Sequence, residues 1–177
     1  MTNRISLVFN ALGFQLVWWA SVLGVIFGQP LMGPIVLTIY LGVHLRLIRF
    51  SQSEVILLLA AGLLGTAIDT FFAATGAVRY SGGYENLHWL APVWISAMWI
   101  GFSATINHSL KWLKNRPLVG FIMGAIFGPL AYHTGTRFDV VQVSDQPLLS
   151  WVTLALAWGL AIPTLYYISQ RLQRRES

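Results

Sequence analysis

The sequence predicts an all-α protein, a polytopic transmembrane bundle of six helices whose N- and C-termini both lie on the cytoplasmic side. Three observations lead to this prediction. Hydrophobic residues make up 56% of the 177-residue chain and charged residues only 10%, which is too few charges to coat a soluble domain. The apolar residues occur in runs long enough to cross a bilayer, and the basic residues gather in short clusters between these runs.

Six apolar segments are candidates for membrane crossings. A helix rises about 1.5 Å per residue, so about 20 residues cover the roughly 30 Å of hydrocarbon. The second segment fits least well, because His44 and Arg46 lie near its end. We expect a single integral membrane domain over residues 1–177, with spans at about residues 6–27, 31–48, 55–75, 87–106, 118–134 and 148–168.

The first of these segments has the position of a secretory signal peptide but not its composition. Its apolar part is too long, a single arginine precedes it, and no small-residue cleavage motif follows. We therefore count it as a membrane helix.

The basic residues indicate the orientation of the bundle. Alternate flanks of the six segments carry nine of the 11 basic residues, whereas the opposite flanks carry only Arg79 and Arg137. Basic residues are retained on the cytoplasmic side of a membrane, so both termini are expected there, in agreement with an even number of crossings. The nine residues are Arg4, Arg46, Arg49, Lys111, Lys114, Arg116, Arg171, Arg174 and Arg175.

Small residues recur every three or four positions in the first, third and fifth segments. The third segment carries Gly62 and Gly65, and the fifth carries Gly120, Gly124 and Gly128. This spacing favours close approach of helix backbones in lipid. We expect these three helices to form the centre of the bundle.

Asp69 is the one carboxylate well inside a predicted span. A buried carboxylate is costly unless it is paired or neutralised, so we expect a buried charge pair with Arg137, with Arg79 and His133 as alternatives. Such a pair would fix the register of the helices. The alternative is a proton-relay or ligand-binding role, as in a carrier.

A second group of polar residues lies in the leaflet near the cytoplasm. The fourth segment ends in Asn-His-Ser, and polar residues of the first two segments are expected at the same depth. They would form a ligand-binding pocket in which a histidine could move a proton near neutral pH. The alternative is a purely interfacial role. The candidate pocket consists of Asn10, Gln15, His44, Asn107 and His108.

Three basic residues follow this group directly. Lys111, Lys114 and Arg116 are expected at the membrane surface, where they would contact anionic headgroups.

No catalytic signature is present in the sequence. The chain has no cysteine, which excludes thiolate metal sites and cysteine nucleophiles, and its four histidines are too few for a desaturase-type di-iron site. His44 and His108 could hold a bis-histidine haem by depth, but nothing else supports one. We therefore predict no catalytic residue, metal or cofactor, and an enzyme is less favoured than a binding protein.

Three strings of the chain resemble an uncharacterised family of bacterial inner-membrane proteins, the domain-of-unknown-function family 2878. They are "FNALGFQLVWWASVLG", "APVWISAMWIGFSATINHSLKWL" and "GAIFGPLAYHTGTRF", and the likeness covers roughly Ile5 to Gln170. The resemblance implies a small multi-pass protein of the bacterial inner membrane, encoded beside fatty-acid-modifying genes, and no known activity. Its pattern includes residues that match Asp69, Asn107, His108 and Arg137.

Three functions are therefore considered. The first is an accessory membrane protein of lipid metabolism that binds a phospholipid or a fatty-acid-derived ligand. The second is a small-solute or proton-coupled carrier that uses Asp69. The third is a membrane scaffold, acting as a homodimer or with another membrane protein. Nucleic acid is not expected as a partner, because the basic residues are dispersed between apolar spans.

Overall fold

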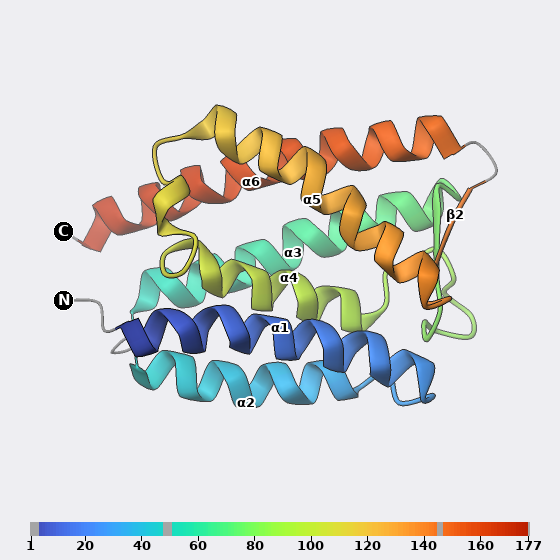
Figure 1. The fold of residues 1–177 in the computed structure, drawn as a ribbon, viewed down its shortest axis with the longest axis horizontal. Helices are drawn as coiled ribbons and strands as arrows, with labels where there is room; N and C mark the ends of the chain where they lie inside the picture. Colours follow the sequence, from blue (N-terminus) through green and yellow to red (C-terminus); the bar gives the residue numbers. More distant parts are fainter. Residues whose placement is uncertain (1–3, 48–50, 145–146, 177) are drawn as a thin grey trace.

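Six α-helices run roughly along the longest axis of the molecule (Figure 1). The computed structural model describes residues 4–47, 51–144 and 147–176. The first helix begins and the last helix ends at the same end of the bundle (Figure 1). The helices are α1 (Arg4–Ile26), α2 (Met32–Leu47), α3 (Gln52–Ala74), α4 (Val93–Ile106), α5 (Pro117–Arg137) and α6 (Pro147–Glu176).

Helix α3 begins three residues earlier than expected, at Gln52 instead of Val55. The side chain of Ser51 caps it by accepting a hydrogen bond of 3.4 Å from the backbone N–H of Glu54. A serine followed three residues later by a glutamate is a common signal for a helix N-terminus. Hydropathy alone does not register this signal, which explains the shift in the predicted boundary.

Helix α4 is shorter than expected, because it begins at Val93 and not at Leu87. Pro92 occupies its N-cap position in an extended conformation. The residue before a proline is disfavoured in the helical region, so the helix cannot extend toward Leu87. Residues 84–91 instead form turns.

Two helices continue past their predicted ends, α5 by three residues and α6 by eight. Helix α5 continues to Arg137 and α6 to Glu176, and both have basic residues in their last turn, where positive charge suits the helix dipole. The predicted end of the second span at Ile48, together with Arg49 and the side chain of Arg4, lies outside the described residues.

A small antiparallel ribbon joins the loops after α3 and α5. Strands β1 (Val78–Tyr80) and β2 (Val141–Val143) pair with Val78 opposite Val143 and Tyr80 opposite Val141. The fold is therefore all-helical apart from this ribbon, which was not predicted. The ribbon links the two loops by hydrogen bonds between their strands, at the end of the bundle opposite the chain termini (Figure 1).

The centre of the bundle is α4, which packs against α1, α2, α3 and α6. The expectation that α5 lies at the centre was wrong, because α5 packs chiefly against α6. The glycine spacing did mark close contacts: Gly65 lies against Trp99 of α4, and Gly128 lies against Trp158 of α6. Glycines thus report which face of a helix is in contact, but not how many neighbours the helix has.

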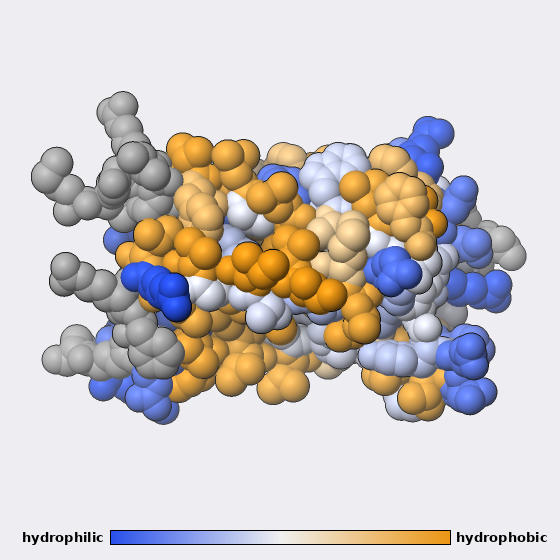
Figure 2. Space-filling view, turned by 90° about the horizontal axis from the view of Figure 1, so that it is seen from below, coloured by the Kyte–Doolittle hydropathy of each residue, from blue (hydrophilic) through white to orange (hydrophobic). Residues whose placement is uncertain are grey.

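The outer surface is apolar along the middle of the bundle and hydrophilic at its ends, as Figure 2 shows for one face. Large side chains near the middle of their helices, such as Leu63, Ile126 and Ile39, are exposed. Four helices are long and apolar enough to cross a membrane, whereas the apolar helices α2 and α4 have only 16 and 14 residues. An apolar exterior of this extent is typical of a helical membrane protein.

Candidate functional site

Two histidines and a glutamate from three segments come together in one cluster. Helix α2 ends, α3 begins and α4 ends at the end of the bundle where α1 begins (Figure 1). Glu54 lies in the first turn of α3, His44 near the end of α2, and His108 just after α4. The Nε2 atoms of His44 and His108 lie 3.4 Å and 3.2 Å from the same oxygen, Oε1 of Glu54. The two imidazole rings meet edge to face, with centroids 4.9 Å apart. We call these three residues the His–Glu–His cluster.

Asn107 connects this cluster to α6. Its Nδ2 donates a hydrogen bond of 3.0 Å to Oε2 of Glu54, and its Oδ1 accepts one of 2.7 Å from Ser169. Both oxygens of the Glu54 carboxylate therefore have donors, and the carboxylate is held in one orientation.

Asn10 of α1 braces the other side of the cluster. Its Nδ2 donates to the hydroxyl of Tyr40 at 2.9 Å and to the carbonyl of Ala104 at 2.8 Å. Its Oδ1 accepts from the backbone N–H and the hydroxyl of Ser109, at 3.2 Å and 2.6 Å. All three residues of the string Asn-His-Ser after α4 therefore belong to the network, because Asn107 and His108 contact Glu54 and Ser109 contacts Asn10.

Four of the five residues predicted for a polar pocket thus lie in one network, namely Asn10, His44, Asn107 and His108. Gln15 is not part of it and lines a separate groove. Because both Nε2 atoms contact a single oxygen of Glu54, no space remains between the rings for a haem. Glu54 is the residue that sequence reasoning missed, although its place in a helix capping pattern was visible.

Asp69, the second polar residue singled out in the sequence, is fully buried in α3. Its carboxylate accepts hydrogen bonds from the hydroxyls of Tyr80 at 2.5 Å and of Tyr132, and from the indole N–H of Trp99 at 2.7 Å. Burial raises the pKa of the Tyr80 phenol in β1 well above its usual value, so this hydroxyl remains a donor at neutral pH. The carboxylate is thus satisfied by neutral donors.

The expected charge pair between Asp69 and Arg137 is absent from the structure. Arg137, Arg79 and His133 are all exposed, and the ion pairs in the described part of the chain join histidines to Glu54. Three neutral donors from α4, α5 and β1 stabilise the carboxylate at less cost than a second buried charge would incur.

A groove of about 440 Å³ runs between α1 and α5. Its floor includes Phe102 of α4 and Trp158 of α6, and Trp19 and Phe127 on its rim are exposed. Leu110 and the short 3₁₀ helix η1 (Lys111–Leu113) contribute further lining. Because exposed side chains form the rim, the groove opens onto the apolar outer surface.

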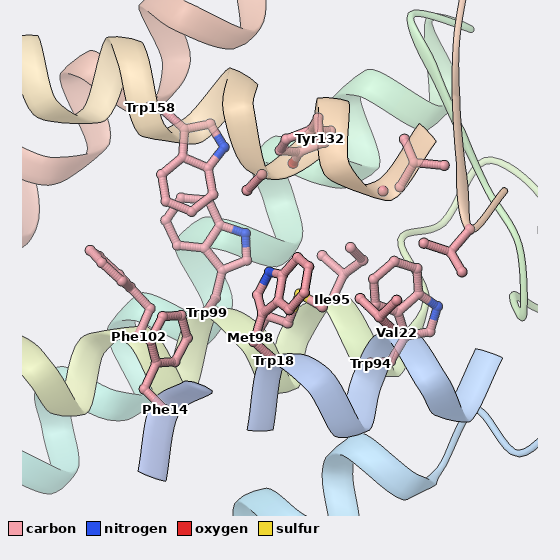
Figure 3. Close-up of a pocket in the computed structure, with 14 residues that line it drawn as sticks. Phe14, Trp18, Val22, Trp94, Ile95, Met98, Trp99, Phe102, Tyr132 and Trp158 are labelled. Carbon is pink, nitrogen blue, oxygen red and sulfur yellow. The ribbon is translucent and has the colours of Figure 1, made fainter. Parts of the chain in front are cut away.

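A smaller chamber of about 90 Å³, whose lining residues are drawn in Figure 3, shares Phe14, Phe102 and Trp158 with this groove. Trp158 and Trp99 stack at 4.1 Å between ring centroids, and Phe14 and Trp18 approach from α1. Tyr132 lines the chamber and also donates to Asp69, so the chamber adjoins the buried carboxylate.

These features define a class: a helical protein with the apolar surface of a membrane protein, a polar network at one end and an apolar groove between two helices. The model of the DUF2878 family, whose members are described as proteins of unknown function, matches residues 7–164. The chain therefore belongs to this family. No curated protein and no solved structure matches it.

Proposed function

We propose that the protein crosses the bacterial inner membrane six times with both termini in the cytoplasm. Helix α1 begins and helix α6 ends at the same end of the bundle, which supports an even number of crossings (Figure 1). The short helix α4 is surrounded by four other helices, so protein and not lipid contacts most of its surface. Helix α2 would cover about 24 Å at 1.5 Å per residue, and its shortfall is small enough for local thinning of the bilayer.

This topology can be tested by cysteine labelling, because the chain has no native cysteine. Tyr84→Cys places a thiol in the loop between β1 and α4, and Lys111→Cys places one at the opposite, basic end. Both positions are exposed. In spheroplasts, a membrane-impermeant maleimide is expected to label Tyr84→Cys and to leave Lys111→Cys unlabelled until the membrane is permeabilised. Labelling of Lys111→Cys in intact spheroplasts would contradict the orientation.

We further propose that the protein binds a membrane lipid, with an acyl chain in the groove between α1 and α5. The observation that carries this proposal is the groove itself, whose volume lies within the usual range for ligand pockets. Its lining is chiefly aromatic and aliphatic, with Gln15 and Thr134 as its polar side chains, which suits a hydrocarbon chain.

The basic residues near η1 are suited to the headgroup. Lys111 and Lys114 lie in or next to η1, and Arg116 lies at the N-cap of α5. Leu113 of the same segment lines the groove. A phosphate held by these cations would therefore place the acyl chains close to the groove.

Filling the groove should abolish this binding. Ala131 lines both the groove and the chamber, so Ala131→Trp would occupy the space of an acyl chain. Native mass spectrometry of delipidated protein titrated with palmitoyl-oleoyl phosphatidylglycerol should show one retained lipid for the wild type. Because the new indole occupies the space of an acyl chain, retention by the variant should be at least about tenfold weaker, which corresponds to about 1.4 kcal/mol. A parallel titration with oleic acid separates a phospholipid from a free fatty acid.

The matched control is Ile39→Trp, which adds the same side chain at an exposed position of α2 outside the groove. It should retain lipid as the wild type does. Equal retention by Ala131→Trp and the wild type, with both eluting as folded species, would show that the groove is not the lipid site.

A carrier that uses Asp69 has less support. Its carboxylate already accepts three hydrogen bonds from donors on three elements. A transported ion or proton would have to displace these donors, whereas the groove offers space without any rearrangement.

A further inference from the structure

The spacing of the His–Glu–His cluster is that of a metal-binding site. Two ligands of a tetrahedral metal ion at about 2.1 Å lie about 3.4 Å apart. The Nε2 atoms of His44 and His108 lie 3.4 Å and 3.2 Å from Oε1 of Glu54, and the three residues each offer a ligand atom within 4.8 Å of the other two. An ion placed among them needs only small side-chain movements to reach all three.

The surroundings hold these ligands in place. The second carboxylate oxygen of Glu54 accepts from Asn107, which is itself fixed by Ser169. Metal-binding carboxylates usually have such a partner on the oxygen that does not face the ion. The ligands come from three different segments, so the packing of α2, α3 and α4 positions them before any ion arrives.

The protonation of the imidazoles is compatible with a metal ion. In the ion-free cluster each Nε2–H can donate to Oε1, and on metal binding each ring proton moves to Nδ1. For His44, the nearest group to Nδ1 is Nδ2 of Asn10 at 3.5 Å. Both hydrogens of that amide have better acceptors, on Tyr40 and Ala104, so the amide does not hold His44 in one tautomer.

Exposure leaves a route to the site. The side chains of His44 and Glu54 are 2% and 6% exposed, whereas that of His108 is 19% exposed. A metal ion would therefore enter past His108, and its fourth ligand on that side would be water or a bound molecule.

We propose that His44, Glu54 and His108 bind one divalent transition-metal ion. Two imidazoles and one carboxylate favour Zn²⁺ or Fe²⁺ over Mg²⁺ and Ca²⁺, which prefer oxygen ligands alone. This set of ligands leaves a coordination position open, as in catalytic metal sites and unlike closed structural ones. The metal site is independent of the proposed lipid groove, because none of its three ligands lines that groove.

The test is zinc stoichiometry of the full chain in detergent, purified with an affinity tag that contains no histidine and stripped with a chelator. After incubation with Zn²⁺ and removal of the excess, elemental analysis should find one zinc per chain. Competition titration should show at least about tenfold weaker binding for His108→Gln, as expected when a ligand that orients and binds the ion is lost. His108 is chosen because it is the most exposed of the three ligands, so its variant should fold.

The matched controls are His88→Gln and His133→Gln, the other two of the four histidines, both exposed and outside the cluster. They should bind zinc as the wild type does. A wild-type chain that retains no stoichiometric zinc would overturn the proposal, as would a His108→Gln variant with unchanged affinity. Loss of zinc in His88→Gln or His133→Gln would place the ion elsewhere and would overturn it as well.

Discussion

Replacing Asp69 with asparagine should lower the thermal stability of the protein markedly. The two carboxylate oxygens of Asp69 accept from Tyr80 and Tyr132 on one side and from Trp99 on the other. An asparagine amide offers only one acceptor oxygen, so at least one buried donor loses its partner, at a cost of about 1–3 kcal/mol. For a chain of this length the apparent Tm in detergent should fall by about 2–12 °C, measured by fluorescence at a fixed scan rate.

Asp139→Asn is the matched control for this substitution. Asp139 is exposed, and its φ of 54° is one that asparagine adopts readily. The Tm of this variant should stay close to that of the wild type, because exposed substitutions usually change stability by less than about 0.5 kcal/mol. If Asp69→Asn also left the Tm unchanged, the carboxylate would not be a structural anchor and a carrier role would gain support.

The helices were the most predictable part of the fold, because their apolar runs are long and uninterrupted. All six were expected. The starts of α3 and α4 were missed where a local rule overrides hydropathy, at Ser51 and Pro92, and the end of α6 was missed because the helix continues through polar residues beyond its apolar run. The β ribbon could not be predicted, since strands of three residues carry too little periodicity. The central position of α4 could not be predicted either, because it depends on which of six similarly apolar helices pack against one another.

The polar network was only partly predictable for a related reason. Depth in the membrane can be counted from the sequence, and His44, Asn107 and His108, which were grouped by depth, do lie in one hydrogen-bonded network. The direction of a side chain around a helix of unknown rotation cannot be counted, which explains why Gln15 was included. Glu54 was not considered because the predicted third span began one residue after it. The partners of Asp69 were missed because tyrosine and tryptophan were considered as apolar or interfacial residues and not as donors.

The contact between α5 and α6 should be highly sensitive to a single added methyl group. A Cβ atom built on Gly124 overlaps the backbone carbonyl of Trp158, and it lies 2.8 Å from a side-chain carbon of Ile162. A backbone carbonyl inside a helix cannot rotate away, so Gly124→Ala must push the two helices apart. Since α5 packs chiefly against α6, we expect a loss of about 1–3 kcal/mol and a fall in apparent Tm of about 2–12 °C.

Gly42→Ala separates this overlap from the effect of alanine on helix propensity. Gly42 lies in α2, and a Cβ atom there meets no other atom within 4 Å. Alanine is the better helix former by about 1 kcal/mol, so this variant should be as stable as the wild type or slightly more stable. The difference in Tm between the two variants then measures the close approach of α5 and α6 directly. Equal values would mean that the helices can separate without cost and that small residues at this spacing do not determine how the bundle packs.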